Sequence, residues 1–236
     1  MSAGIPGDAA NVPDVMADGR AIDGARLAEV LVAGIRHLFQ RRDYINKINV
    51  FPVPDSDTGT NMAFTFKSML EVIERRRDWR LPELVGALGE AALDGARGNS
   101  GAIMAQYFQG FREAVGERLQ LDSQALAAAC ARGAEQAWTA MSEPVAGTLP
   151  TVLDDHAQAL RAAAAKSTSS IKETFSAGLE GARCSLANTP NQLPVLKQAG
   201  VVDAGGQGFV DLLEGISAFI REGVIDELDA EWKQMT

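Results

Sequence analysis

The sequence predicts an all-α fold, a single bundle-like domain of about eight helices. Apolar residues recur at helical spacing through most of the chain, and no stretch alternates convincingly in the way of a half-buried strand. Helix-capping and turn residues interrupt this pattern at short intervals. The predicted helix faces are rich in Ala and Gly, which let antiparallel helices pack closely.

The first predicted element is a long helix that begins near Ile22. Residues 1–21, which precede it, are mostly Gly, Ala, Pro and Asp with little apolar periodicity, and they are expected to form a mobile N-terminal extension. The helical pattern stops at the turn Pro52–Pro54 and resumes in a second helix from Met62 to Ile73. The apolar face of the first helix contains Leu27, Val30, Leu31, Ile35 and Leu38.

Caps and turn residues delimit the later helices. Pro82 stands in the first turn of a helix that extends to about Ala96. Asp122 and Ser123 are suitable caps for a helix that runs to about Met141. The remaining helices are predicted over Ile103–Phe111, Thr148–Lys166, Ile171–Leu186, Pro194–Gly200 and Phe209–Phe219. Residues 22–222 therefore form the helical domain, and residues 223–236 are expected to be a C-terminal tail.

The composition narrows the class of protein. The chain has 236 residues, a net charge of −9 and an isoelectric point near 4.8, which argues against a nucleic-acid partner. No apolar run is long enough to span a bilayer, and the first residues lack an apolar signal core. Cys130 and Cys184 lie among small apolar residues, so both are expected to be buried free thiols. A cytoplasmic location fits these features.

Four segments combine Gly with Asn, Asp, Ser or Thr at predicted helix edges. Glycine lets backbone N–H groups approach an anion closely, and a helix N-terminus presents free N–H groups and the positive end of a dipole. Gathered at one end of a bundle, such loops would hold the phosphates of a nucleotide. The segments are Asn49–Asn61, Gly98–Gly101, Gly147–Thr148 and Val202–Gly208.

The first of these segments contains two carboxylates one residue apart, Asp55 and Asp57. Carboxylates this close repel each other unless a cation lies between them, so the pair is a natural site for Mg²⁺ on nucleotide phosphates. Taken alone, the same two residues are more often a solvated turn or a helix cap. The presence of all four segments on one chain favours a phosphate site.

In sequence and order, these segments resemble a known family. The chain is similar to the nucleotide-binding L domain of dihydroxyacetone kinases, and most of all to the N-terminal domain of the bacterial fatty acid kinase A subunit. The similarity extends from about Ile22 to Phe219. It rests on four motifs: Asn49–Met62 (NVFPVPDSDTGTNM), Ala96–Gly101 (ARGNSG), Glu143–Thr148 (EPVAGT) and Val201–Gly208 (VVDAGGQG).

The resemblance implies a barrel of eight antiparallel helices that binds ATP or ADP with two Mg²⁺ ions at one end. It places Asn49, Asp55 and Asp57 on the metal ions, with the two aspartates as the catalytic residues. Thr58, Gly59, Thr60 and Asn61 would line the β-phosphate side of the nucleotide. The other implied nucleotide contacts are Asn99 and Ser100 at the phosphates, Thr148 and Leu149 beside the nucleotide, and Asp203, Ala204 and Gly205 closing over it.

The motifs depart from the family pattern in three places. Ser56 replaces a usual Gly between the two aspartates, and it is expected to cost about 1 kcal/mol if the position needs a positive φ. Ala146 replaces a common Glu, and Pro150 replaces a common Leu. Asn49 stands where dihydroxyacetone kinases carry an acid, which favours the fatty-acid branch of the family.

The favoured function is a Mg²⁺-dependent kinase domain that transfers the γ-phosphoryl group to an acceptor held by a partner protein. The acceptor is expected to be a fatty-acid carboxylate on a lipid-carrier (fatty-acid-binding) protein. Alternatives are an L-type dihydroxyacetone kinase subunit that works with a dihydroxyacetone-binding subunit, a nucleotide-binding module without kinase activity, and a lipid-binding helical barrel. A homodimer is a further possibility. The fatty acid kinase subunit continues into further domains, so a stand-alone protein, a split kinase and a part of a longer chain all stay open.

Overall fold

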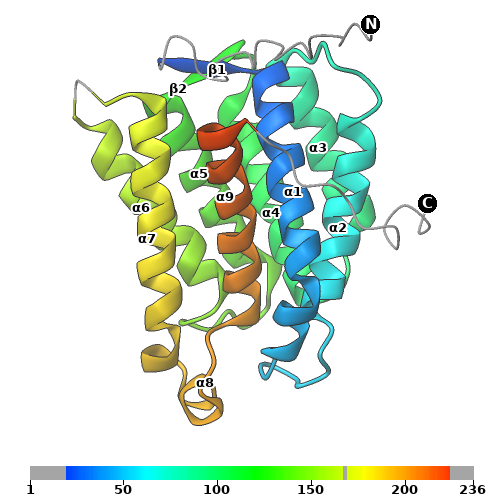
Figure 1. Ribbon diagram of the computed structural model, residues 1–236, viewed down its shortest axis with the longest axis vertical. Helices are drawn as coiled ribbons and strands as arrows, with labels where there is room; N and C mark the ends of the chain where they lie inside the picture. Colours follow the sequence, from blue (N-terminus) through cyan, green and yellow to red (C-terminus); the bar gives the residue numbers. More distant parts are fainter. Residues whose placement is uncertain (1–19, 167–168, 224–236) are drawn as a thin grey trace, which may run out of the picture.

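The computed structural model describes residues 20–166 and 169–223 of the chain (Figure 1). The expected N-terminal extension and C-terminal tail lie almost wholly outside these residues. Within them, no helix combines the length and the apolar character needed to cross a membrane.

The predicted all-α fold is confirmed. The described residues form nine α-helices and one short 3₁₀-helix, η1. The helices are α1 (Gly24–Lys47), α2 (Thr58–Ile73), α3 (Leu81–Gly95), α4 (Gly98–Val115), α5 (Ser123–Ala137), η1 (Trp138–Ala140), α6 (Leu149–Ala164), α7 (Ile171–Gln192), α8 (Pro194–Ala199) and α9 (Ala204–Glu222).

Eight long helices form a closed antiparallel ring, and α8 is a short addition between α7 and α9 (Figure 1). Each long helix packs against the next one along the chain, and α9 closes the ring by packing against both α7 and α1. In such an up-and-down arrangement, alternate helices begin at the same end of the barrel. The N-termini of α2, α4, α6 and α9 are therefore gathered at one end.

A small antiparallel sheet closes the opposite end, where α1 and α5 begin. Its strands are β1 (Ala21–Asp23) and β2 (Gln120–Asp122), with Ile22 opposite Leu121. The expectation of no strands was wrong here, because three residues are too few to show an alternating pattern. The helix that was predicted to begin near Ile22 begins at Gly24 instead, because Ile22 belongs to β1. Asp23 caps this helix by accepting a hydrogen bond from the backbone N–H of Arg26 at 2.9 Å.

Helix α7 continues past the end predicted at Leu186 and includes Pro190. A proline has no N–H to donate to the carbonyl four residues earlier, here that of Leu186. The hydroxyl of Thr189 donates to this carbonyl at 2.7 Å instead. A side chain thus replaces the missing backbone donor, which is why the helix extends to Gln192.

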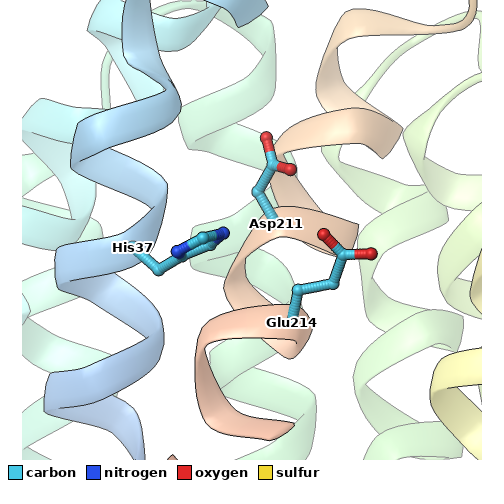
Figure 2. Close-up of side chains that lie close together, drawn as sticks. All are labelled: His37, Asp211 and Glu214. Atoms are coloured by element: carbon cyan, nitrogen blue, oxygen red, sulfur yellow. The ribbon is translucent and has the colours of Figure 1, made fainter. Parts of the chain in front are cut away.

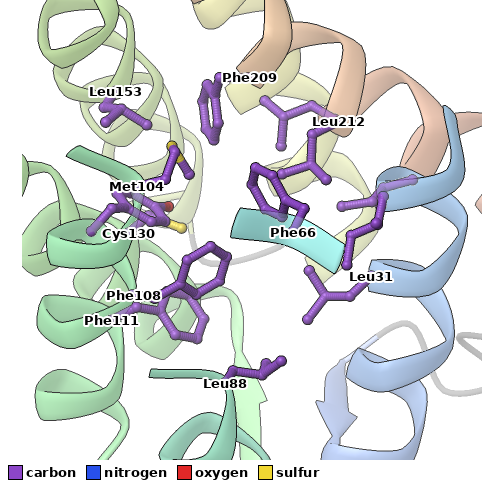
Figure 3. Close-up of a cluster of buried hydrophobic side chains, with 14 of the residues drawn as sticks. Leu31, Phe66, Leu88, Met104, Phe108, Phe111, Cys130, Leu153, Phe209 and Leu212 are labelled. Carbon is purple, nitrogen blue, oxygen red and sulfur yellow. The ribbon is translucent and has the colours of Figure 1, made fainter. Parts of the chain in front are cut away.

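The interior of the barrel is a continuous apolar core (Figure 3). Phe66 and Phe108 meet edge to face with ring centroids 6.1 Å apart, an arrangement that aromatic pairs prefer. Cys130 is buried as predicted, and burial raises the pKa of its thiol to about 12. Cys184 is exposed, contrary to prediction, because it lies on the outer side of α7 beside Glu180.

Two glycines allow α1 and α9 to approach closely and close the ring. A Cβ atom added at Gly34 would lie 2.6 Å from the backbone oxygen of Leu212. A Cβ atom added at Gly215 would lie 2.5 Å from the Cβ of His37. Neither position has room for a side chain at the present distance between the helices.

Replacing Gly34 with Ala is expected to lower the free energy of unfolding by about 1–3 kcal/mol, because the methyl group forces α1 and α9 apart. Gly86 of α3 is a matched control, since a Cβ atom there meets nothing within 4 Å. Gly86→Ala should raise the free energy of unfolding by about 0.5–1 kcal/mol through helix propensity alone. Urea unfolding of both variants measures the difference, and equal effects in the two would contradict this account of the closure.

A second prediction concerns His156, which lies in α6 and is 2% exposed. Its Nδ1 atom has no hydrogen-bond partner in the described part of the chain. Its ring and that of Phe209 are nearly perpendicular, with their centroids 5.2 Å apart. Burial lowers the pKa of His156 to about 4. Between pH 4 and 6.5 the unfolded chain therefore binds a proton that the folded protein does not.

The free energy of unfolding should fall as the pH falls from about 6.5 towards 4, by up to about 3 kcal/mol from this residue. His156→Leu should remove this dependence. The measurement is the difference between wild type and variant across the pH range, in which contributions from other groups cancel. Parallel stability curves for the two proteins would show that His156 is not the cause.

Candidate nucleotide and metal site

The four sequence motifs meet at one end of the barrel because each precedes or begins one of the alternate helices α2, α4, α6 and α9. The residues that immediately precede α2, α4 and α6 form no side-chain cap on these helices, and the first turn of each lacks acidic residues. Two other side chains engage two of these helix starts: Asn46 accepts from the N–H of Thr60 in α2, and Asp203 accepts from the N–H of Leu149 in α6. At the opposite end, side chains cap α1, α5 and α7. Free N–H groups and positive dipole ends thus converge at the motif end, which favours binding of an anion.

The loop between α1 and α2 carries the two predicted metal-binding aspartates, and Asn49 organises it. Asn49 is 4% exposed, and its amide donates to the backbone oxygen of Val53 at 3.0 Å and to Oδ1 of Asp55 at 2.8 Å. The hydroxyl of Thr58 donates to Oδ1 of Asn49 at 2.6 Å. Asp57 immediately precedes α2, but its carboxylate does not cap that helix. The helix cap that might have explained Asp57 is therefore not formed, whereas Asp55 is exposed in the loop, as the alternative of a solvated turn predicted.

Ser56, between the two aspartates, has a φ of 57°. This is the left-handed region, which the substitution of Ser for Gly was expected to make costly. The loop therefore stores strain at the residue between Asp55 and Asp57.

A polar pocket lies between this loop and the start of α4. It contains all three predicted metal ligands together with four of the predicted nucleotide contacts. Its lining residues are Asn49, Pro52, Val53, Asp55, Asp57, Thr58, Asn61, Gly98, Asn99 and Ser100. Their side chains supply carboxylate and amide oxygens, the donors that Mg²⁺ prefers.

The start of α4 approaches this pocket closely. Gly98 has a φ of 58°, and a Cβ atom there would lie 2.4 Å from the amide nitrogen of Asn61. The conformation and the contact both require glycine. The segment Gly98–Gly101 was predicted to interrupt two helices, but in the structure it forms the first turn of α4.

An apolar cleft adjoins the polar pocket and shares Pro52, Thr58, Asn99 and Ser100 with it. The predicted residues Thr148, Leu149, Asp203 and Gly205 line this cleft. Sequence reasoning did not single out its apolar members, although each lies close to a polar motif in the sequence. They include Phe51, Ile103, Met141 and Val145.

Three of the predicted nucleotide contacts line neither of the two cavities: Gly59, Thr60 and Ala204. Asn46 of α1 makes two hydrogen bonds with Thr60. The backbone N–H of Thr60 donates to Oδ1 of Asn46 at 3.0 Å, and Nδ2 of Asn46 donates to the hydroxyl of Thr60 at 2.9 Å. A Cβ atom at Gly59 would lie 2.3 Å from the backbone oxygen of Arg42. Gly59 and Thr60 therefore dock the start of α2 against α1, and Ala204 is the first residue of α9.

Asp203 connects the starts of two helices. It is 5% exposed and caps α9 by accepting from the N–H of Gly206 at 2.7 Å, and it also accepts from the N–H of Leu149. Its own N–H donates to Thr189 at 3.1 Å. Burial raises the pKa of Asp203 to about 6, and the two backbone N–H groups oppose this rise. The predicted glycine-rich loop is accordingly shorter than expected, because α9 begins at Ala204.

Replacing Ser56 with Gly is expected to raise the free energy of unfolding by about 0.5–1 kcal/mol, because Gly adopts a positive φ without steric penalty. Ser217→Gly, in the ordinary helical backbone of α9, is the matched control. It should lower the free energy of unfolding by about 0.5 kcal/mol. Chemical unfolding measures both, and destabilisation by Ser56→Gly would refute the strain.

Comparison with known proteins identifies the family. The model of the DAK2 domain family matches residues 52–218. Protein YloV of Bacillus subtilis (strain 168) is 39% identical over 202 residues, which cover 86% of this chain and 36% of that protein. An uncharacterized protein of Staphylococcus aureus (strain bovine RF122 / ET3-1) is 40% identical over 214 residues, which cover 89% of this chain and 39% of that protein. The chain thus spans little more than a third of the length of these relatives.

The fold also matches a solved structure, that of the dihydroxyacetone kinase from C. freundii in complex with AMP-PNP and Mg²⁺. The TM-score is 0.62 at 18% sequence identity, and the match covers 92% of this chain and 37% of the other. At this identity the match establishes the shared fold. Taken with the family match and the similarity to the two bacterial proteins, it leads to one conclusion: the chain belongs to the DAK2 domain family.

Proposed function

We propose that the motif end of the barrel binds ATP or ADP with Mg²⁺, and that the domain is the nucleotide-binding part of a phosphotransferase. The observation that supports this most is the pocket in which the starts of α2 and α4 meet Asp55 and Asp57, because the residue that precedes each of these helices forms no side-chain cap. Free N–H groups attract phosphate oxygens, and the two carboxylates attract the cation that accompanies them.

The residues of the polar pocket fit two Mg²⁺ ions by their chemistry. Asp55 and Asp57 offer carboxylate oxygens, and Asn49 offers an amide oxygen that now accepts from Thr58. Bound there, the ions would neutralise negative charge on the phosphates during transfer. The residues of the chain would orient the phosphates: Asn61, Asn99 and Ser100 from the walls of the pocket, and Thr58 from the first turn of α2.

The apolar cleft suits the nucleoside part of the ligand. It adjoins the polar pocket, and hydrophobic side chains such as Ile103, Met141 and Leu149 line it. A base could pack against these side chains while the phosphates extend toward Asp57. Asp203 would keep the starts of α6 and α9 together beside the ligand.

The residues that line the two cavities include no histidine. An acceptor hydroxyl would therefore need a general base from elsewhere, whereas a carboxylate is already ionised and needs none. This favours a fatty-acid carboxylate presented by a lipid-carrier protein. Asn49, which stands in place of the acid of dihydroxyacetone kinases, supports the same choice.

A second function, a nucleotide-binding module that needs other domains for transfer, is favoured by the strained Ser56 between the aspartates. A third candidate function is that of an L-type subunit of dihydroxyacetone kinase, which the structural similarity to that enzyme supports.

The test is thermal unfolding with Mg²⁺ and AMP-PNP. The wild-type melting temperature should rise by about 4 °C or more at saturating ligand, because the ligand binds the folded state. Asp57→Asn should abolish this rise. Asp78→Asn, an exposed aspartate in the loop between α2 and α3, is the matched control and should keep it.

A transfer assay distinguishes the phosphotransferase from the nucleotide-binding module. The phosphotransferase should transfer the γ-phosphoryl group to a fatty acid on a lipid-carrier protein, and Asp57→Asn should lose this activity. Nucleotide binding without transfer to a fatty acid or to dihydroxyacetone would favour the module. An unchanged melting temperature of the wild type would refute all three functions.

A further inference from the structure

Three side chains with metal-binding atoms meet away from the motif end, between α1 and α9. Figure 2 shows the imidazole of His37 and the carboxylates of Asp211 and Glu214 facing the same space. One ligand atom from each lies within 4.8 Å of the other two. Asp211 comes eight residues after Asp203, the cap of α9, which places it about 12 Å along the helix from the proposed nucleotide site.

The close approach of α1 and α9 creates this arrangement. Asp211 and Glu214 are three positions apart on α9 and so share a face of that helix. Gly215 lies directly against His37, because a Cβ atom there would be 2.5 Å from the Cβ of His37. Without a side chain at position 215, the imidazole comes within reach of both carboxylates.

Asp211 has a buried carboxylate oxygen that no described residue engages by a hydrogen bond. It is 1% exposed, and its Oδ2 atom has no hydrogen-bond partner among the described residues. Its other oxygen, Oδ1, accepts from Nε2 of Gln207 at 2.9 Å and lies 3.5 Å from Nε of Arg41. A buried carboxylate oxygen without a partner is costly, and buried charges are as a rule paired or bound to a metal.

Two arginines face the carboxylates of the cluster, one each. Arg183 contacts Glu214 through Oε1, with Nη2 at 2.8 Å. Arg41 lies on the Oδ1 side of Asp211 and stacks over the ring of Tyr44 at 4.4 Å. Each arginine thus engages one oxygen of one carboxylate, and Oδ2 of Asp211 is engaged by neither.

We propose that His37, Asp211 and Glu214 form a site for a divalent transition-metal ion such as Zn²⁺ or Mn²⁺. One imidazole nitrogen with two carboxylate oxygens is a ligand set for such ions, whereas Mg²⁺ and Ca²⁺ prefer oxygen alone. Tetrahedral ligands of Zn²⁺ are about 3.4 Å apart for bonds of about 2.1 Å. Side-chain rotations that shorten these separations by up to about 1.4 Å would bring the three ligand atoms to bonding positions.

The ion would join α1 to α9, where the ring of helices closes. It is therefore a structural site, independent of the nucleotide and of the proposed Mg²⁺ ligands. Solvent or further side chains would supply the remaining coordination positions.

The experiment adds Zn²⁺ alone, and separately Mn²⁺ alone, to chelator-treated protein without nucleotide. Calorimetry should show one bound ion per chain, and the melting temperature should rise by about 4 °C at saturation. His37→Gln and Glu214→Gln should each abolish the rise. Glu180→Gln, which removes an exposed carboxylate 3.8 Å from the same Arg183, is the matched control and should keep it.

Asp57→Asn should also keep the rise, which separates this site from the proposed nucleotide site. Circular dichroism of each variant confirms that it is folded, and Glu214→Gln decides the matter if His37→Gln does not fold. The proposal is overturned if neither ion binds to the wild type, or if both ligand variants keep the full rise in melting temperature.

Discussion

The packing of α9 against α1 is the contact on which the rest of the structure depends. It closes a ring whose other members are neighbours along the chain, and it requires Gly34 and Gly215 because a side chain at either position would collide with the facing helix. Closure brings the loop after α1 and the start of α9 to the same end of the barrel. The polar pocket and the apolar cleft therefore adjoin each other.

The two ends of the barrel differ in how their helix N-termini are satisfied. Side chains of Asp23, Asp122 and Ser170 cap helices at one end, where they contribute stability in the usual way. At the motif end Asp203 caps α9, whereas the described residues that precede α2, α4 and α6 form no such cap. At α4, which no other side chain of the described structure caps, this forgoes about 1 kcal/mol. Stability given up there leaves N–H groups available to a ligand, as is common at functional sites.

Buried polar side chains support the motif end from behind. Asn46 and Asn49 hold the start of α2 and the acidic loop, while Thr189 and Asp203 hold the starts of α6 and α9. These hydrogen bonds leave Asp57 without a capping role, and they hold Ser56 at a positive φ.

The helices and the all-α class could be predicted from the sequence, because periodicity, caps and turn chemistry act over a few neighbouring positions. This prediction missed the two three-residue strands, the continuation of α7 through Pro190 and the exposure of Cys184. Each of these depends on a partner or a side chain that local pattern does not reveal. Which predicted residues line a cavity, and which do not, as for Gly59 and Thr60, depends on how the helices pack and is seen in the three-dimensional structure alone. The tertiary structure alone placed His37 beside Asp211 and Glu214, because that meeting requires the first and last helices of the ring to pack together.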